Sequence, residues 1–374
     1  MVQLAQCVRR VARPHQLFRG ARLGGAADQT TAAHAVVGPR AAGAEAGVAG
    51  ELHHGHPRAA GGSRHTRAPG GYRRRVPSLT HRIVAFALPR LNPAVVITDP
   101  ERLRASLVAK NRTRQTTPPA WLAKHFDVTV EDIGFPVYVA TPRGGSFART
   151  LVHLHGGSFT ATAHVRQWKF AAALARRTAA RLVVPAYPLA PEHTWRDSVP
   201  ALTAYVAGLC ADGEVVLSGD SAGGGMALAV ALGVRDLVRS GGATAQPTKL
   251  ILIAPWADLT RSAPGTEEAA ERDPWLSIEN HDTYALFWAG SEADLVRTEV
   301  SPALGDLTDL PPAMLLCGTH DMLYAGAEAL AARAAAVGWP VVFEVGHGLL
   351  HVYPILPVTE ARGALKRLAA FVNG

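Results

Sequence analysis

One serine stands in a pattern that could perform covalent chemistry. Residues 215–225 read VVLSGDSAGGG, in which apolar β-formers run into a glycine cluster and an alanine-rich segment of helical composition. Gly219, Ser221 and Gly223 fit the pattern G-x-S-x-G. Small residues two positions before and after the serine let a strained turn between strand and helix hold its hydroxyl outward. Ser221 is therefore a candidate nucleophile.

The same glycines could instead cradle a phosphate at the start of a helix. A phosphate-binding loop of the type G-x-x-x-x-G-K-[ST] would need a lysine and a hydroxyl where Gly225 and Met226 stand. A dinucleotide fingerprint, G-x-G-x-x-G, would need a glycine at the position of Ser221. The residues required for either phosphate-binding motif are therefore missing, and a turn that exposes a nucleophilic serine is the interpretation we keep.

A serine hydroxyl is a poor nucleophile at neutral pH and requires a base and an orienting acid. Asp321 ends the apolar run AMLLCGTHD, and His351 follows the run VVFEVG. Both are therefore expected at carboxyl ends of strands, where Ser221 also lies, and in the chain order Ser, Asp, His. These residues are the predicted acid and base.

Two other residues compete for these roles. Asp258 also follows an apolar run, but aspartates in turns commonly bind their own backbone, so we interpret it as structural. His347 is the alternative to His351 as base. The two histidines have the spacing His-x-x-x-His, but glycines flank His347 and no helix is expected to place both on one face, so no metal site is predicted.

An acyl-transfer site also needs donors for the oxyanion. The apolar run LVHLH leads into HGGSF, residues 155–159, which is expected to form a loop beside the end of the nucleophile's strand. We predict that the backbone N–H groups of Gly157, Ser158 and Ala222 provide the oxyanion hole. An ordinary glycine turn is the alternative interpretation.

Strands and helices alternate strictly around these residues. The apolar runs are continuous over four to six residues, which is typical of strands buried on both faces of a parallel sheet. The sequence thus predicts an α/β fold with a doubly wound sheet. Strands are expected at 150–155, 181–187, 214–220, 249–256, 313–321 and 340–346, and helices at 167–180, 197–209, 221–238, 325–338 and 358–372.

Two segments depart from this alternation. Residues 78–91 and 99–113 have helical apolar spacing, with Asp99 and Pro100 typical of a helix start, and an antiparallel hairpin follows at 128–133 and 135–140. The stretch 262–298 is acidic, carries four aromatic residues and contains no evident strand. It is interpreted as an insertion above the sheet.

The basic character of the chain is confined to its N-terminal part. Residues 1–75 contain twelve Arg and three acids, a charge of +9, so residues 76–374 account for −1 of the total of +8. This arm is rich in Ala, Gly, Arg and His and lacks apolar periodicity, so we predict that it is a disordered extension. We hypothesise that it results from a start codon placed too far upstream. Its composition also resembles a transit peptide. No nucleic-acid partner is expected.

The three cysteines, Cys7, Cys210 and Cys317, form no CxxC pattern and indicate a cytoplasmic protein without disulfides. The cluster His53, His54 and His56 lies in the basic arm and is interpreted as compositional. No run of about 18 apolar residues occurs, so membrane contact is expected to be peripheral at most. The amphipathic segment 82–96 would supply such contact in a membrane-surface lipase, although packing as a cap helix is favoured.

From about residue 77 onward the chain resembles the hormone-sensitive-lipase-like branch of the α/β-hydrolase superfamily, the bacterial carboxylesterases. The motifs occur in order: HLHGGSF at 153–159, YPLAPEH at 187–193, GDSAGG at 219–224, SPALGDLTDLPPAMLLCGTHDML at 301–323 and GLLHVYP at 348–354. Ser158 replaces the third glycine of the family's His-Gly-Gly-Gly segment, which could narrow the pocket or add a hydroxyl contact.

The resemblance implies an α/β-hydrolase fold and a serine esterase without a cofactor. Ser221 would be the nucleophile, His351 the general acid and base, and Asp321 its orienting carboxylate, with Gly157, Ser158 and Ala222 as oxyanion donors. The supporting motif positions would be His155, Gly156, Gly219, Asp220 and Gly223. Residues 77–125 and 262–298 would form a cap over the acyl pocket of the domain 76–374.

The expected substrates are short- to medium-chain carboxylic esters. A deacetylase, an amidase or a lactone hydrolase would use the same residues, so these alternatives stay open. A ligand-binding protein on the same fold is a different class, although an intact set of Ser, Asp and His argues against it. A homodimer is also left open.

Overall fold

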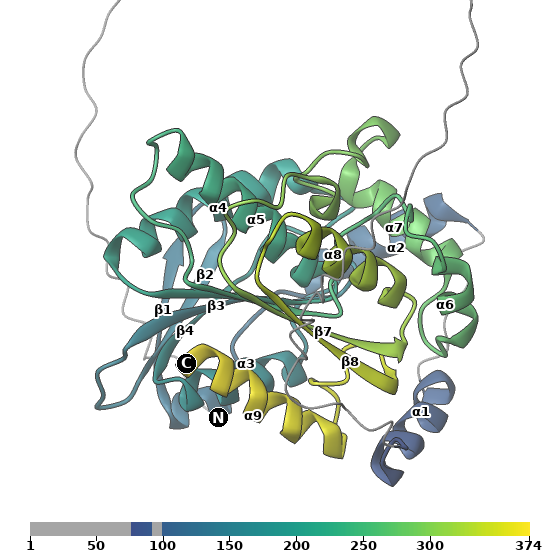
Figure 1. Cartoon of the computed structure of the whole chain (residues 1–374), viewed down its shortest axis with the longest axis horizontal. Helices are drawn as coiled ribbons and strands as arrows, with labels where there is room; N and C mark the ends of the chain where they lie inside the picture. The colour runs from purple at the N-terminus through teal and green to yellow at the C-terminus, as the bar shows by residue number, and fades with distance from the viewer. Residues whose placement is uncertain (1–75, 92–98) are drawn as a thin grey trace, which may run out of the picture. The chain divides into compact units, whose positions relative to one another are not determined.

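The computed structural model describes residues 76–91 and 99–374 (Figure 1). The predictions made for residues 1–75, and part of the amphipathic segment 82–96, lie outside the described residues. The element bounds below apply to the described ranges alone.

An eight-stranded sheet forms the centre of this part of the chain, in the order β1-β2-β4-β3-β5-β6-β7-β8. β1 pairs antiparallel with β2, and β2 with β4, whereas the remaining pairs are parallel. The predicted hairpin and the predicted parallel sheet are both confirmed. The strands are β1 (Phe126–Asp132), β2 (Pro136–Pro142), β3 (Arg149–Leu154), β4 (Ala180–Pro185), β5 (Val215–Asp220), β6 (Lys249–Ile253), β7 (Ala313–His320) and β8 (Val341–Leu350).

Helices cover both faces of the sheet, as the continuous apolar strands require. Figure 1 shows α3 and α9 on one face and α4, α5 and α8 on the other. This arrangement confirms the doubly wound α/β fold. The bounds are α3 (Val165–Arg177), α4 (Trp195–Asp212), α5 (Ala222–Arg239), α8 (Tyr324–Ala336) and α9 (Thr359–Asn373).

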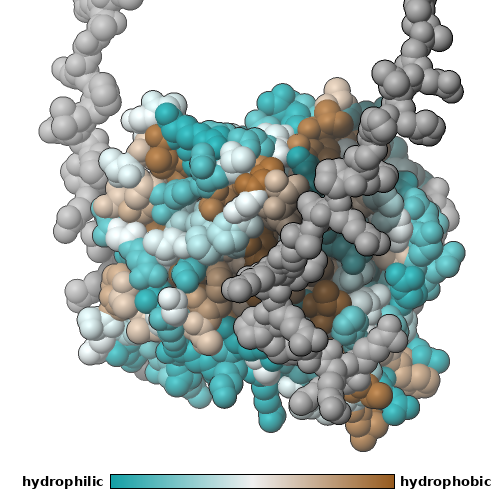
Figure 2. All heavy atoms as spheres, viewed as in Figure 1, coloured by the Kyte–Doolittle hydropathy of each residue, from teal (hydrophilic) through white to brown (hydrophobic). Residues whose placement is uncertain are grey.

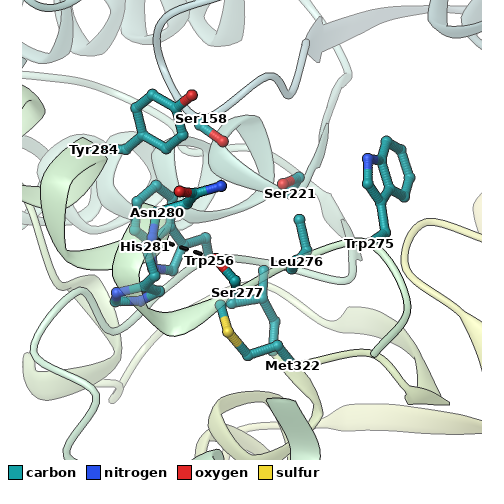
Figure 3. A pocket seen from close by; sticks show the side chains of 11 residues that line it. Ser158, Ser221, Trp256, Trp275, Leu276, Ser277, Asn280, His281, Tyr284 and Met322 are labelled. Atoms are coloured by element: carbon teal, nitrogen blue, oxygen red, sulfur yellow. Dashed lines mark hydrogen bonds between the residues drawn. The ribbon is translucent and has the colours of Figure 1, made fainter. Parts of the chain in front are cut away.

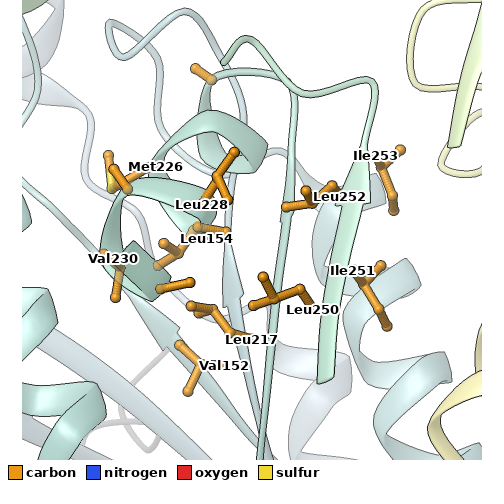
Figure 4. Packing of buried hydrophobic residues seen from close by; sticks show 14 of the residues in the cluster. Val152, Leu154, Leu217, Met226, Leu228, Val230, Leu250, Ile251, Leu252 and Ile253 are labelled. Atoms are coloured by element: carbon orange, nitrogen blue, oxygen red, sulfur yellow. The ribbon is translucent and has the colours of Figure 1, made fainter. Parts of the chain in front are cut away.

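α5 packs closely against the strands around it. α5 is buried almost all round because it lies between the sheet and α4, and its small residues let it approach both. Met226, Leu228 and Val230 of α5 pack over Leu217 of β5 and Leu250 of β6 (Figure 4). This packing fixes the start of α5, where Ser221 stands.

The predicted insertion contains two helices, α6 (Thr266–Arg272) and α7 (Ile278–Ala289), followed by short 3-10 turns at Glu292–Asp294 and Pro302–Leu304. The N-terminal part contains α1 (Leu79–Leu91), α2 (Pro100–Thr113) and a 3-10 turn at Ala120–Lys124. α2 begins as predicted, since the Asp99 side chain accepts a hydrogen bond from the Arg102 backbone N–H and Pro100 follows it.

α1 packs against the segment around β8 and α9. The backbone N–H of Ser78 donates to Glu360 at 2.6 Å, and the Leu350 N–H donates to Nε2 of buried His81 at 3.0 Å. Apolar side chains complete the contact: Val84, Ala85 and Leu88 of α1 with Leu350, Leu356 and Val358. α1 is thus attached directly to the residue that precedes His351.

The opposite face of α1 is apolar and exposed. Leu79, Ile83 and Phe86 are each more than half exposed, and the Arg90 guanidinium lies over the Phe86 ring. Brown side chains among teal ones mark this helix at the lower right of Figure 2. Among residues 76–91 and 99–374, no helix combines the length and apolar character needed to cross a bilayer.

β8 is longer than predicted. The apolar run predicted a strand at 340–346, but β8 continues to Leu350. Gly318 of β7 lies opposite Gly346, and the ladder resumes after an irregularity with His320 opposite Leu350. A Cβ on Gly318 would lie 2.1 Å from the Leu349 carbonyl oxygen. Gly318 and Gly346 therefore leave space for this irregular pairing, which places His351 at the end of the sheet.

Gly225→Ala is expected to destabilise the fold by about 3 kcal/mol. A Cβ at this position would lie 1.9 Å from the backbone carbonyl oxygen of Trp256, so α5 would have to move away from the end of β6. Urea unfolding of the purified protein measures the change.

Gly208→Ala in α4 is the matched control. A Cβ there meets no atom within 4 Å, and alanine favours a helix over glycine, so this variant should gain roughly 0.5–1 kcal/mol. Equal stability of the two variants would contradict the close approach of α5 to Trp256.

Candidate active site

Ser221 lies in a strained turn between β5 and α5. Its φ of 53° and ψ of −124° place it in a region that non-glycine residues rarely adopt. A Cβ on Gly219 would lie 2.1 Å from the Gly223 oxygen, and one on Gly223 would lie 2.1 Å from the Leu154 oxygen. Only glycine fits at both positions, which explains the spacing of the pattern in physical terms.

The backbone around Ser221 is held on both sides. Its N–H donates to the Ile253 carbonyl at 2.8 Å, and its own carbonyl accepts from Gly224 N–H and from Trp256 N–H, both at 2.9 Å. These bonds connect the turn to the end of β6. They hold the strained conformation that aims the Ser221 hydroxyl away from the sheet.

A continuous hydrogen-bonded chain joins the three predicted members of the triad. His351 Nε2 lies 3.0 Å from Ser221 Oγ, and His351 Nδ1 lies 2.9 Å from Asp321 Oδ2. The carboxylate can only accept, so Nδ1 carries the proton and Nε2 is free to accept one from the serine. Asp321 and His351 are buried, whereas Ser221 is partly accessible.

Asp321 is held in a fixed orientation at the end of β7. Its Oδ1 accepts the Leu323 backbone N–H at 2.9 Å, and its Oδ2 lies 3.4 Å from the Cys317 thiol. Burial raises the pKa of the Cys317 thiol, and the charge of Asp321 adds to that shift. The thiol is therefore a neutral neighbour of the carboxylate rather than a second nucleophile.

The environment of His351 favours its protonated form. Burial alone lowers the pKa of this side chain, but the charge and hydrogen bond of Asp321, with further negative charge from Asp273 and Asp220, raise it above the ordinary value. A raised pKa is what a group that accepts the serine proton requires.

We expect the pH profile of kcat/KM on p-nitrophenyl acetate to have an acidic limb with a midpoint above 6.5, the ordinary value for histidine. A general base works only when neutral, so activity is lost as the pH falls through the raised pKa. Initial rates measured between pH 5 and pH 9 give the midpoint of this limb. A limb centred below 6.5 would mean that burial outweighs the three carboxylates.

The loop after β3 approaches the nucleophile closely. A Cβ on Gly156 would lie 2.9 Å from the Ser221 Cβ. Gly157, Ser158 and Phe159 have consecutive positive φ values of 127°, 51° and 59°, which turn the loop back toward the site. Ala222 begins α5, so its N–H has no acceptor within the helix. The predicted oxyanion donors thus lie on two segments that meet at Ser221.

His155 holds this loop from beneath. Its Nδ1–H donates to the Gly156 carbonyl at 3.0 Å, its ring stacks on Tyr187 at 4.3 Å, and the Tyr187 hydroxyl donates to the His155 carbonyl at 2.6 Å. Burial lowers the pKa of His155 to about 4. The side chain is thus a neutral structural support.

Asp220 connects three segments behind the nucleophile. Its Oδ2 accepts from Gln167 Nε2 at 2.8 Å, and its Oδ1 lies 3.3 Å from Nε2 of His153. Gln167 also reaches the Gly156 carbonyl at 3.3 Å. The sequence assigned Asp220 to the motif without a chemical role, and its contacts show that it joins β5, α3 and β3.

Neither of the two competing residues belongs to the hydrogen-bonded chain from Ser221 to Asp321. Asp258 accepts hydrogen bonds from the N–H and hydroxyl groups of Thr260 and Ser262 in its own turn, which agrees with the structural role expected. His347 is exposed within β8. Among the described residues, no three His, Cys, Asp or Glu side chains are grouped so that they could hold a metal ion.

A cavity of about 200 Å³ opens beside Ser221 (Figure 3). Its wall mixes large apolar side chains with a few polar ones, as ligand sites commonly do. Much of it comes from the insertion, at residues 275–284. The lining residues are Ser158, Ser221, Trp256, Trp275, Leu276, Ser277, Asn280, His281, Tyr284, Met322 and Leu323.

Sequence reasoning missed one carboxylate beside the triad. Asp273 accepts hydrogen bonds from the backbone N–H groups of Trp275 and Leu276 and, through its other oxygen, from Met322 at 2.8 Å. It therefore ties the cavity wall to the turn that carries Asp321. Burial raises the pKa of Asp273, and the charge of Asp321 adds to the shift. No motif marks this residue; only its position before a tryptophan could have drawn attention to it.

Comparisons with known proteins agree on the family. Residues 151–355 match the family model described as the alpha/beta hydrolase fold. An acetyl-hydrolase of Streptomyces hygroscopicus is 32% identical over 236 residues, which cover 60% of this chain and 75% of that protein. An esterase of Acinetobacter venetianus is 27% identical over 250 residues, covering 64% of this chain and 81% of that protein.

Solved structures share the fold. An esterase/lipase from an uncultured bacterium superimposes with a TM-score of 0.62 at 24% identity, covering 79% of this chain and 98% of that one. The esterase of Pyrobaculum calidifontis gives a TM-score of 0.62 at 23% identity, with 76% and 97% covered.

Proposed function

This chain belongs to the hormone-sensitive-lipase-like branch of the α/β-hydrolase fold family and is a carboxylic ester hydrolase; we propose that Ser221, His351 and Asp321 are its catalytic triad. The observation that carries this proposal is the hydrogen-bonded chain from Ser221 Oγ through His351 to Asp321. The strained turn that exposes the hydroxyl supports it further.

In acylation, Ser221 Oγ attacks the ester carbonyl while His351 Nε2 takes the hydroxyl proton. The carbonyl oxygen becomes an oxyanion, which accepts hydrogen bonds from the N–H groups of Gly157, Ser158 and Ala222. Such donors stabilise the transition state by about 3 kcal/mol each. The intermediate collapses, the bond to the alcohol oxygen breaks, and His351 gives its proton to the departing alcohol.

Deacylation repeats these steps with water. His351 Nε2 removes a proton from the water, whose oxygen attacks the acyl carbonyl, and the same donors bind the second oxyanion. The bond to Ser221 Oγ then breaks and the serine recovers its proton from His351. Asp321 keeps the imidazole in the required tautomer throughout and stabilises its cationic form.

The substrates are proposed to be short- to medium-chain esters. The cavity of about 200 Å³ beside Ser221 favours the short end of that range. The Streptomyces relative is named an acetyl-hydrolase, which also supports a small acyl group. Tryptophans at 256 and 275 bound the cavity.

Covalent labelling tests the proposal directly. A fluorophosphonate probe should react with Ser221, and peptide mass spectrometry should find the adduct on that residue. Hydrolysis of p-nitrophenyl esters from C2 to C16 should fall with chain length. An enzyme that neither reacts with the probe nor hydrolyses any ester of the series would contradict the proposal and favour a ligand-binding protein on this fold.

A deacetylase, an amidase or a lactone hydrolase would use the same triad. Acetylated sugars, anilides and γ-lactones assayed beside the ester series distinguish these activities. A rate on any of them that exceeds the best ester rate would replace the carboxylesterase assignment, while labelling of Ser221 would be unchanged.

The remaining predictions concern the cellular compartment, lipid contact and oligomeric state of the protein. The free, buried Cys210 and Cys317 support a cytoplasmic protein. Peripheral contact with a lipid surface is supported by the exposed apolar face of α1, whose charged residues, Arg82 and Arg90, are both basic. Flotation with anionic vesicles measures this contact, and sedimentation velocity tests the homodimer.

A further inference from the structure

The cavity beside Ser221 shares a wall with a second, smaller cavity. The second cavity has room for about 20 Å³ and lies toward the turn of Asp258 and the start of α8. Four residues line both spaces: Trp256, His281, Met322 and Leu323. These side chains therefore lie between the two cavities, and displacement of the Trp256 ring would enlarge the cavity beside Ser221 by the volume of the ring and of the small space behind it.

Trp256 has the largest side chain of the four residues that line both cavities, and it is fixed by several contacts. Its indole Nε1–H donates to His281 Nε2 at 2.6 Å, drawn as a dashed line in Figure 3. Its ring stacks on Phe159 at 5.6 Å, and Phe159 in turn stacks on Trp288 at 4.1 Å. Its backbone N–H donates to the carbonyl of Ser221. The side chain that bounds the cavity is thus tied to the nucleophile turn.

His281 can accept from Trp256 in one protonation state only. An indole N–H donates and never accepts, so Nε2 of His281 must be unprotonated and Nδ1 must carry the proton. Nδ1–H then donates to Asp282 at 3.0 Å. The Arg261 guanidinium fixes Asp282 with two contacts, at 2.7 Å and 2.9 Å. Burial lowers the pKa of His281, which keeps the ring neutral.

We propose that His281 is a positioning residue for substrate specificity: it holds the Trp256 indole across the acyl pocket and restricts the enzyme to esters of short acyl chains. This inference rests on the proposed esterase function. His281 belongs to no motif of the sequence, and the triad does not use it.

The volume of the cavity with the Trp256 ring in place indicates the size of acyl group that fits. A protein cavity of about 150 Å³ holds one benzene molecule, so about 200 Å³ has room for an acyl group of a few carbons. A longer acyl group would need the space that the Trp256 ring itself occupies in the cavity wall. While the hydrogen bond to His281 holds the indole, acetyl to butyryl esters fit and longer acyl groups meet the wall.

His281→Phe tests the proposal because it keeps a ring in the wall but removes the acceptor for the indole. We expect the ratio of kcat/KM on p-nitrophenyl octanoate to that on p-nitrophenyl acetate to rise at least about tenfold, the size of effect that pocket walls exert on chain length. His281→Gln is the matched control, since its amide oxygen can accept from Trp256 and should keep the wild-type ratio. Trp256→Phe removes the donor and should also raise the octanoate-to-acetate ratio. If His281→Phe fails to fold, Trp256→Phe alone tests whether the indole limits acyl-chain length.

The outcomes separate this inference from the proposed function. A wild-type protein that hydrolyses acetate esters, with His281→Phe and Trp256→Phe at the wild-type ratio, would overturn the inference and leave the esterase intact. A change confined to alcohol length, measured with ethyl and hexyl acetate, would also overturn it. A wild-type protein inactive on all esters and unlabelled at Ser221 would instead contradict the proposed function.

Discussion

Ser221→Ala is expected to lower kcat on p-nitrophenyl acetate about a million-fold, the loss seen when a serine hydrolase loses its nucleophile. Without Oγ no acyl-enzyme can form, and only the oxyanion donors and binding remain to act on direct attack by water. A progress curve at high enzyme concentration, with the fluorophosphonate probe in parallel, measures the loss.

The variant should keep the wild-type fold. Alanine retains the Cβ of serine, so the turn at φ 53° has the same contacts, and one side-chain hydrogen bond to His351 is lost. We expect the Tm to change by a few degrees at most. Ser146→Ala, at an exposed loop position, is the control for purification and assay. Activity within tenfold of the wild type in Ser221→Ala would exclude this serine as nucleophile.

Asp321→Asn is expected to lower kcat about 10⁴-fold. The amide would place a donor or a weaker acceptor opposite His351 Nδ1, so the imidazole could no longer be held with its proton on that atom. The variant should also move the acidic limb of the pH profile to lower pH. The charge of Asp321 raises the pKa of His351, so its removal lowers that pKa.

Asp258→Asn is the matched control, because Asp258 is the other aspartate that follows a strand. Its carboxylate is bound within its own turn, so kcat should stay within a few-fold of the wild type while stability falls. A large loss in Asp258→Asn with little loss in Asp321→Asn would reverse the choice of acid. The two variants together therefore test which strand end supplies the carboxylate.

The parts of the site that the sequence could predict are those set by chain order and strand ends. Ser221, Asp321 and His351 each follow a strand of the parallel part of the sheet, and parallel strands end at the same edge, so their meeting follows from the topology. The glycines of the turn were also predictable, because their need follows from close backbone approach. These features depend on local pattern and on the rules of α/β sheets.

The residues that sequence reasoning missed depend on how loops pack. Asp273 and His281 lie in the insertion, where no period or motif marks a functional position, and their partners Met322 and Trp256 come from distant segments. β8 was predicted too short because the apolar run VVFEVG ends at Gly346, whereas pairing with β7 keeps the strand extended to Leu350. In both cases contacts between distant segments, rather than a local pattern, determine the feature.

The cap remains a prediction, and its two segments, 77–125 and 262–298, differ in how closely they approach the cavity. Residues 275–284, in and just before α7, line the cavity beside Ser221. In the N-terminal segment, α2 contacts α7 and the loop after β4. Its Arg104 lies over the Phe287 ring of α7, and its Asn111 donates a hydrogen bond to the Ala190 carbonyl. α1 instead packs on the segment around β8 and α9.

The contact between α1 and β8 defines how far the chain can be shortened from its N-terminus. His81 provides the acceptor for the Leu350 N–H, one residue before the base, and Ser78 binds the Glu360 side chain. A truncated protein that starts after His81 would leave a buried N–H without a partner next to His351 and uncover Leu350, Leu356 and Val358. We therefore expect full activity only from fragments that start at or before Ser78, well upstream of the first strand.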